Sequence, residues 1–302
     1  MTIAMSMVSV CIPAYDPGPY LLPAVKSVLA QAYSDFELLI VDDASDPPIS
    51  SILEGVDDPR IRLHRNEANL GLTGNWNRCL ELARGRCITV FHQDDVMRCD
   101  NLSAKVGFLD SHPSVGMVYS NIERIDADGC TIGGHWTDQP QADTVMKGSE
   151  MFALIARQGN PVSCPSVLVR SDCYRELGPF DPRLAFAVDL EMWLRIASRY
   201  DVGYIADPLI QQRQHPEQET VRFAGSGRDY EDVLKALDIA FAAGLPKDCA
   251  RHAQESYRTL ASQAWPMTRW KLRQGRLDAA SRYMLVTARA GMRCVLQKSR
   301  GR

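Results

Sequence analysis

The sequence predicts an α/β protein with a mainly parallel sheet flanked by helices and a C-terminal helical extension. Short runs rich in Val, Ile and Leu alternate with amphipathic segments along the first part of the chain. These runs are continuously apolar, which is typical of strands buried on both faces of a parallel sheet. From Asp229 onward the hydrophobic spacing is helical. We therefore expect an α/β domain over residues 1–220 and a basic helical extension over residues 221–302.

The predicted elements begin with a strand at Val8–Ile12, where Pro13 stops the apolar run, and a helix within Tyr20–Tyr33. Further strands are expected at Phe36–Val41, Ile61–His64, 87–91, Val115–Tyr119 and Val167–Arg170. Further helices are expected at Trp76–Ala83, Leu102–Ser111 and Asp189–Arg199, and region 120–150 is predicted to hold strands and loops. Because crossovers between parallel strands share one hand, the carboxyl ends of the strands meet at one edge of the sheet.

The composition is that of an ordinary globular protein. The chain has 302 residues, of which 45% are apolar and 24% charged, enough to bury a large core. Nine scattered cysteines without metal-binding spacing predict free thiols in a reducing compartment. The first residues lack the basic start of a signal peptide, and no apolar run reaches the ~18 residues of a spanning helix. We expect a cytoplasmic protein. A further expectation is peripheral contact with the inner face of the membrane.

The charge is unevenly distributed. Residues 251–302 hold twelve Lys and Arg against two acidic residues. Residues 1–250 hold 22 Lys and Arg against 35 acidic residues. An acidic body with a basic tail is not typical of nucleic-acid binders, so no nucleic-acid partner is expected. Helical spacing places four arginines of the tail on one stripe, namely Arg282, Arg289, Arg293 and Arg300. Such a basic amphipathic helix can lie on an anionic membrane, or it can pack on the body with its basic face solvated.

Acidic residues follow the apolar runs. Phe91-His92-Gln93-Asp94-Asp95 comes directly after the expected strand 87–91, and Asp42-Asp43 ends the strand Phe36–Val41. Carboxylates at a sheet edge can hold a divalent cation, although acidic loops also occur simply as solvated surface. The chain contains neither G-x-G-x-x-G nor G-x-x-x-x-G-K-[ST], which argues against a Rossmann dehydrogenase and a P-loop enzyme.

Taken in order, several segments resemble the inverting family 2 glycosyltransferases of the GT-A fold. They are Pro13-Ala14-Tyr15-Asp16, the stretch from Glu37 to Asp46, Asn69-Leu70-Gly71 with Asn75, and the acidic cluster at 92–95. The resemblance runs from about Val8 to His215. It implies transfer of a sugar from a nucleotide-diphosphate donor, a UDP- or dTDP-sugar, to a saccharide or lipid-linked acceptor. It also implies a Mg²⁺ or Mn²⁺ cofactor and a role in polysaccharide or glycoconjugate assembly.

The resemblance assigns substrate contacts to eight residues, which are Pro13, Tyr15, Asp42, Asp43, Asn75, His92, Asp95 and Arg213. Asp42 and Asp43 are expected to accept hydrogen bonds from the base and ribose of the donor. The alternative is an Asx-type turn ahead of Asp46-Pro47-Pro48. Arg213 is expected to neutralise phosphate through charge-assisted hydrogen bonds.

For the metal, the resemblance points to Asp94, with Asp95 as a second candidate whose role is otherwise structural. His92 stands where the family usually has an aspartate, and an imidazole suits Mn²⁺ better than Mg²⁺. His92 is otherwise a strand-end histidine with its bonds satisfied. His215, in Arg213-Gln214-His215, resembles a late Arg-x-His element and is expected to be a cation ligand, the alternative being an ordinary loop histidine.

Asp189 matches the catalytic base of the family. It lies in Ala187-Val188-Asp189-Leu190-Glu191-Met192-Trp193-Leu194-Arg195, with Val188 where an acidic residue is usual. A base must be a carboxylate able to take the proton of the acceptor hydroxyl. The alternatives are a helix N-cap at Asp189 and Glu191 as the base. Two other functions remain open at this stage: a nucleotidyltransferase, and a non-catalytic nucleotide-sugar-binding protein suggested by His92 and Val188.

Overall fold

The computed structural model describes residues 8–134 and 140–300, and the side chains of 8–133 and 140–296. The chain divides into two compact units. The first unit comprises the chain through Met146, Val162–Phe180 and Tyr200–His215, and the second comprises Lys147–Pro161, Asp181–Arg199 and the chain from Pro216. The division at residue 220 stays a prediction, and two segments before that residue belong to the second unit.

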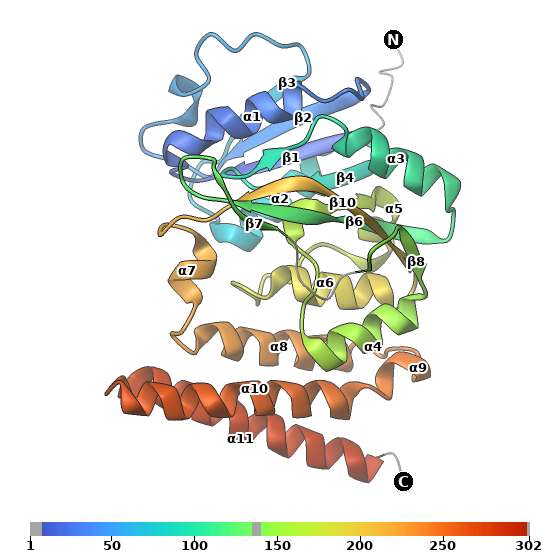
Figure 1. Cartoon of the computed structure of the whole chain (residues 1–302), viewed down its shortest axis with the longest axis vertical. Coiled ribbons are helices and arrows are strands. Elements are labelled where there is room, and N and C mark those ends of the chain that lie inside the picture. Colours follow the sequence, from blue (N-terminus) through green and yellow to red (C-terminus); the bar gives the residue numbers. More distant parts are fainter. Residues whose placement is uncertain (1–7, 135–139, 301–302) are drawn as a thin grey trace. The chain divides into compact units, whose positions relative to one another are not determined.

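The first unit is built on one sheet with strand order β3-β2-β1-β4-β9-β6-β10-β5, with β7 paired to β6 and β8 to β10 (Figure 1). Its strands are β1 (Val8–Ala14), β2 (Phe36–Asp42), β3 (Ile61–Arg65), β4 (Cys87–Val90), β5 (Val96–Met97), β6 (Val115–Ile125), β7 (Thr131–Gly134), β8 (Thr144–Met146), β9 (Val167–Arg170) and β10 (Asp201–Arg213). The strands β1 to β4 pair in parallel, as do β6 and β10, while β9 is antiparallel to both of its neighbours. The expectation of a mainly parallel sheet is confirmed.

Helices cover both faces of this sheet. The helices and short 3₁₀ turns are η1 (Gly18–Tyr20), α1 (Leu21–Leu29), η2 (Ile49–Ser51), α2 (Gly71–Leu82), α3 (Asn101–Ser111), η3 (Cys164–Ser166) and α5 (Ser171–Leu177). Val10 and Ile12 of β1 belong to one core cluster with side chains of α1 and α3. On the other face of β1, the Cys11 thiol donates to the carbonyl of Cys79 in α2. Burial on both faces explains why the strands are continuously apolar.

Two strands, β5 and β10, lie where the sequence pattern predicted none. β10 pairs in parallel with β6, and the register shifts on either side of Pro208. Asp207 and Pro208 interrupt the apolar pattern of this segment, so hydrophobic periodicity does not reveal it as a strand. β6 continues to Ile125, six residues beyond the expected end at Tyr119. Together, β6 and β10 carry Arg213 to the same edge of the sheet as the acidic cluster.

The second unit is helical, as expected for the C-terminal region. It contains α4 (Gly148–Gln158), α6 (Val188–Ala197), α7 (Glu219–Phe223), α8 (Arg228–Ala242), α9 (Lys247–Ala250), α10 (Ala253–Arg273) and α11 (Leu277–Arg300). The long helices α10 and α11 form a hairpin that turns at Gly275, whose φ of +71° suits glycine (Figure 1). Among the described residues, no helix combines the length and apolar character needed to cross a membrane.

Gly85 provides a test of how tightly the segment before β4 is packed. A Cβ at this position would lie 2.5 Å from the Ser9 nitrogen and 2.8 Å from the Val8 carbonyl carbon, both backbone atoms. We expect Gly85→Ala to lower the free energy of unfolding by about 1–3 kcal/mol through overpacking. Gly107→Ala is the matched control, because a Cβ there meets open space and helix α3 should gain up to about 1 kcal/mol. Equal denaturation midpoints for the two variants would contradict this packing.

Candidate functional site

The carboxyl ends of β1, β2 and β4 meet at one edge of the sheet. Ala14 pairs with Asp42, and the amide of Asp43 donates to the carbonyl of Ala14 at 2.8 Å. The amide of Phe91 donates to the carbonyl of Cys11, also at 2.8 Å, and so aligns the end of β4 with β1. Open α/β sheets bind ligands at such an edge. The segments 13–16, 42–46 and 92–95 lie at this edge, where the strands end.

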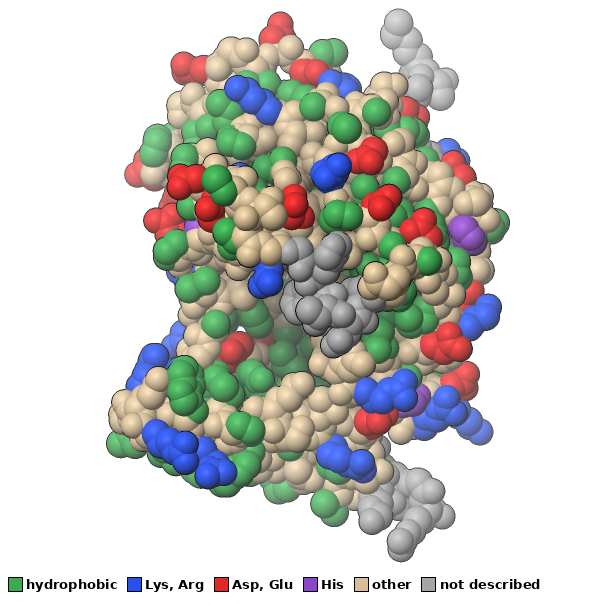
Figure 2. Space-filling model, viewed as in Figure 1, with side chains coloured by type: hydrophobic (Ala, Val, Ile, Leu, Met, Phe, Trp, Pro, Cys, Tyr) green, Lys and Arg blue, Asp and Glu red, His purple; other side chains and the backbone are tan. Residues whose placement is uncertain are grey.

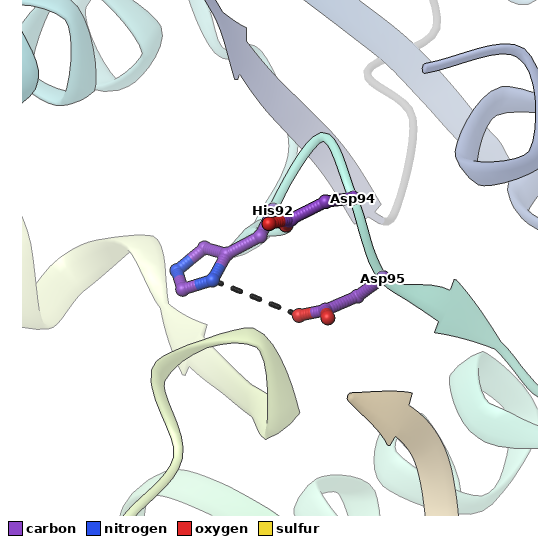
Figure 3. Close-up of side chains that lie close together, drawn as sticks. All are labelled: His92, Asp94 and Asp95. Atoms are coloured by element: carbon purple, nitrogen blue, oxygen red, sulfur yellow. Dashed lines mark ion pairs between the residues drawn. The ribbon is translucent and has the colours of Figure 1, made fainter. Parts of the chain in front are cut away.

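The acidic cluster brings three metal-binding side chains together. His92, Asp94 and Asp95 each offer one ligand atom, and these atoms lie within 4.8 Å of one another (Figure 3). His92 Nδ1 is 3.6 Å from Asp95 Oδ2, and Figure 3 shows the imidazole directed toward that carboxylate. His215, two residues beyond β10, places its Nε2 2.9 Å from Asp94 Oδ2. The structure therefore gathers both predicted metal ligands, Asp94 and His215, with His92 and Asp95.

The electrostatics of this cluster suit a cation. Burial, and then the charge of Asp94, raises the pKa of Asp95 well above its usual value, while burial lowers the pKa of His92. Within the described part of the chain, Asp95 Oδ2 and His92 Nε2 are buried without a hydrogen-bond partner. A cation in the cluster would compensate the Asp95 oxygen, and carboxylates combined with imidazole fit Mn²⁺. The residues present thus fit the expected metal.

Arg213 holds the acidic segment in place. Its side chain is buried, its amide donates to Asp95 Oδ1 at 2.9 Å, and its Nε donates to the carbonyl of Asp94 at 2.9 Å. Its Nη1 donates to the carbonyls of Asp126 and Ala127 at 3.1 and 3.0 Å. These contacts commit much of the guanidinium to protein acceptors. The structure thus shows Arg213 joining three segments, while the phosphate contact expected from the sequence stays a prediction.

Gln93 and Tyr20 support the same edge, and neither was singled out from the sequence. The Gln93 amide side chain accepts from the Tyr15 nitrogen at 2.9 Å and donates to the Tyr15 carbonyl at 3.1 Å. The Tyr20 ring lies 4.6 Å from the His215 ring and stacks against the Arg213 guanidinium. Their partners are distant in sequence, so no local pattern marks them. The one sequence feature that could have indicated a role for Gln93 at the site is its position directly before Asp94 and Asp95.

Asp42 is the last residue of β2, and its carboxylate organises the turn that follows. Its carboxylate accepts from the backbone amides of Ser45 at 2.9 Å and Ile49 at 3.4 Å, and it pairs with Arg65. Although burial opposes ionisation, these hydrogen bonds hold the pKa of Asp42 below its usual value. Ala44 adopts a φ of +62°, which is strained for a residue with a Cβ. The Asx-type turn weighed from the sequence is present.

Asp43 organises the segment that leads into α2. Its carboxylate accepts from Asn66 Nδ2 at 2.8 Å, from the Leu70 amide at 2.8 Å and from the Gly71 amide at 3.0 Å. The last two amides open helix α2, so Asp43 supplies the cap that the helix lacks locally. Asn75, on the first turns of α2, accepts from Asn66 and is also buried. Of the two other substrate residues expected here, Pro13 is half-buried in β1 and Tyr15 is 46% exposed.

Asp189 belongs to the second unit and lies in the first turn of α6. The residue at the N-cap position is Ala187, so the structure does not use Asp189 as the cap. The carboxylate accepts from Asn160 Nδ2 at 2.9 Å and from the Leu190 amide at 2.7 Å. Burial raises the pKa of Asp189 to about 6, against the opposing effect of these hydrogen bonds. A carboxylate with this pKa is ionised at neutral pH and still basic enough to accept a proton.

Neighbouring residues fix the position of α6. Asp232 of α8 accepts from the three successive backbone amides of 185–187 at 2.7 to 3.0 Å. Glu191, the rival carboxylate, is fully buried and pairs with Arg195 at 2.8 Å. Trp193 is also buried. Glu191 is thus engaged in an ion pair, while burial raises the pKa of the Asp189 carboxyl to about 6.

Comparison with known families agrees with this architecture. The family model "Glycosyl transferase family 2" matches residues 9–168, more than half of the chain. The chain therefore belongs to glycosyltransferase family 2. An uncharacterized protein of Mycobacterium tuberculosis (strain CDC 1551 / Oshkosh) is 29% identical over 83% of this chain and 80% of its own length. The UDP-Glc:alpha-D-GlcNAc-diphosphoundecaprenol beta-1,3-glucosyltransferase WfgD of Escherichia coli is 26% identical over 77% of this chain and 85% of its own length.

Solved structures share the GT-A fold. TarS 1–349 of S. aureus, in complex with UDP-GlcNAc, superposes with a TM-score of 0.67 at 15% identity, covering 96% of this chain and 88% of TarS 1–349. The mannosyltransferase PcManGT of Pyrobaculum calidifontis, in complex with GDP-Man and Mn²⁺, gives a TM-score of 0.60 at 16% identity, covering 97% and 86%. The expected fold class is thereby confirmed.

The network around Asp43 leads to a test of its structural role. Asp43→Ala removes three accepted hydrogen bonds, from Asn66, Leu70 and Gly71, and takes away the carboxylate that caps helix α2. We expect unfolding to be easier by about 2–4 kcal/mol without any nucleotide present. Asp35→Ala, at an exposed aspartate before β2, is the control and should unfold like the unmodified protein. If Asp43→Ala melted normally and lost only nucleotide affinity, its role would be confined to the ligand.

Proposed function

We propose that this glycosyltransferase moves a sugar from a nucleotide-diphosphate donor to an acceptor hydroxyl with inversion at the anomeric carbon. The observation that carries the proposal is the cluster of His92, Asp94, Asp95 and His215 at the carboxyl ends of the parallel strands. A family 2 enzyme with this fold would bind a nucleotide sugar there. The UDP-GlcNAc and GDP-Man complexes of the two structural neighbours support a donor of that class.

Asp94 and His215 would hold a Mn²⁺ or Mg²⁺ ion, with His92 and Asp95 as further ligands. A bound cation would stabilise the negative charge that develops on the departing diphosphate. The donor atoms of this cluster come from a segment tied down by Arg213, which keeps them in register before any ligand arrives. The Mn²⁺ in the PcManGT complex supports this choice of metal.

The turn after β2 would receive the base and ribose of the donor. A carboxylate offers about four lone-pair sites, and Asp43 uses three of them within the protein, whereas Asp42 is fully engaged by Ser45, Ile49 and Arg65. Asp43 therefore keeps one acceptor site for an imide N–H or a hydroxyl. Tyr15 and Pro13 border the same edge, and a UDP- or dTDP-sugar is the donor we propose.

Asp189 would act as the general base. As the acceptor oxygen bonds to the anomeric carbon, the carbon–oxygen bond to the diphosphate breaks and the hydroxyl proton passes to the Asp189 carboxylate. Asn160 holds that carboxylate in one orientation. We propose a saccharide or lipid-linked acceptor and a role in polysaccharide or glycoconjugate assembly, supported by the diphosphoundecaprenol acceptor in the name of the E. coli relative.

Replacement of Asp189 tests the base. Asp189→Asn keeps the shape of the side chain and removes its basicity, so we expect transfer to fall by about 10²–10⁴-fold while donor affinity changes little. In the unmodified enzyme, kcat/KM should fall as the pH drops through about 6, because the base is then protonated. Sugar transfer and nucleotide binding would be measured separately across pH.

Glu191→Gln serves as the matched control, because it neutralises the rival carboxylate while keeping its hydrogen-bonding shape beside Arg195. It should retain transfer and the same pH profile. Substantial activity in Asp189→Asn together with loss in Glu191→Gln would reassign the base.

Thermal stabilisation by UDP, dTDP, GDP and CDP, each with and without Mn²⁺, tests the donor and the metal. A nucleotide at about 100 times its Kd stabilises the native state by about 2.7 kcal/mol. We expect the largest shift with UDP or dTDP in the presence of Mn²⁺, and loss of the Mn²⁺-dependent part in Asp94→Asn. Asp100→Asn, five residues past the cluster's last aspartate, is the control. A nucleotide shift unaffected by Mn²⁺ would contradict the metal assignment.

A further inference from the structure

Large apolar side chains are exposed along the α10–α11 hairpin. We use the name hairpin surface for these side chains, which are 41% to 68% exposed: Trp265, Trp270, Leu272, Leu277, Met284, Leu285, Met292, Val295 and Leu296. Scattered single apolar residues are normal on a protein surface. Nine large ones on two adjacent helices form a concentration that is typical of an interaction site.

Helix α11 has two apolar faces. One face is buried, and its side chains include Ala279, Ala280, Tyr283, Val286 and Ala290. The other is the exposed stripe formed by Leu277, Met284, Met292 and Val295, with Leu285 and Leu296 beside it. The spacings of seven, eight and three residues keep this stripe on one side of the helix. Because the first face already satisfies the packing of the helix, the second is available to a partner.

The hairpin surface lies among basic residues. Between residues 253 and 300 the chain has ten Lys and Arg against Glu255 and Asp278. Arg282 and Arg293 pair with Glu231 and Asp238 of α8. Four other arginines, Arg269, Arg273, Arg276 and Arg289, are exposed and have no carboxylate partner among the residues that the structure describes. Figure 2 shows blue basic and green apolar side chains interspersed over these helices, at the bottom of the view.

We propose that the hairpin surface binds the surface of an anionic phospholipid bilayer. Its apolar stripe would enter the boundary between headgroups and acyl chains, and the arginines would contact the negative headgroups. The exposed tryptophans Trp265 and Trp270 are of the type enriched at that boundary. The sequence alone shows only α11 as basic and amphipathic, whereas the hairpin adds both tryptophans from α10.

Charge complementarity selects this partner over two others. A second copy of the chain would bring two strongly basic surfaces together, and like charges oppose such a contact. A nucleic acid would satisfy the arginines through its phosphates but would leave Leu277, Met284 and Met292 without an apolar environment. An anionic bilayer satisfies both kinds of side chain. This inference does not depend on the proposed glycosyl transfer, and its test contains no sugar substrate.

Vesicle sedimentation with the full chain tests the charged part. We expect the protein to bind vesicles of phosphatidylcholine mixed with phosphatidylglycerol, and to bind pure phosphatidylcholine much less. Arg289→Glu should lower the partition coefficient by at least about fivefold, because one basic side chain is lost. Arg175→Glu makes the same charge change at an exposed arginine of α5 and should bind as the unmodified protein does. Equal binding to both vesicle types, or equal loss in both variants, would overturn the proposal.

The apolar part has its own variants. Leu277→Ser combined with Met284→Ser should weaken vesicle binding, and Ile132→Ser, at an exposed residue of β7, should not. Tryptophan emission should shift to shorter wavelength on binding, because Trp265 and Trp270 leave water for the lipid boundary. Trp76 and Trp193 are already buried and should change little. Circular dichroism would confirm that each variant is folded. A stable dimer in light scattering that the double variant dissociates, or RNA binding that vesicles do not displace, would overturn the proposal in favour of that partner.

Discussion

The buried guanidinium of Arg213 is the contact on which the site depends most. The hydrogen bonds of this one residue join the end of β10 to the segment of Asp94 and Asp95 and to the turn after β6. Without it, three carbonyls in two segments would lose a donor in a place with little access to water, at a cost of the order of 1–3 kcal/mol for each group. The acidic pair can therefore remain close together because the surrounding backbone is held rigidly, and such rigidity is what a preorganised cation site requires.

The same residue types serve architecture and chemistry at this sheet edge. Asp43 opens helix α2 through two backbone amides, and Asp42 closes the turn after β2. The Asp43 carboxylate still has an unused lone pair. A ligand that accepts this geometry would therefore meet groups that are already oriented and cost little to order. This explains how a turn that is structurally complete can also be proposed as a recognition surface.

The helical unit shows how tertiary packing changes the meaning of an amphipathic pattern. Counted along α11 alone, the apolar residues are numerous enough for a helix that packs on a protein body. Tyr283 and the small residues beside it make the packing contacts with the protein body, and the large exposed side chains take no part in them. Neighbouring arginines on α11 divide in the same way, since Arg282 and Arg293 have acidic partners on α8 and Arg289 is exposed. What remains exposed is both apolar and basic, and this combination led to the proposed membrane contact.

The sequence by itself determined the strands β1, β2 and β4, their acidic ends, the helical C-terminal region and the family, because each is encoded in a local run of residues. It did not reveal β10, since Asp207 and Pro208 break the apolar pattern and only pairing with β6 defines the strand. Nor did it indicate how much of Asp43 and Arg213 is committed to internal hydrogen bonds, or that Asn160 holds Asp189. Those bonds join residues between 23 and 119 positions apart along the chain. Contacts over such distances leave no trace in local spacing, so only the tertiary structure decided them.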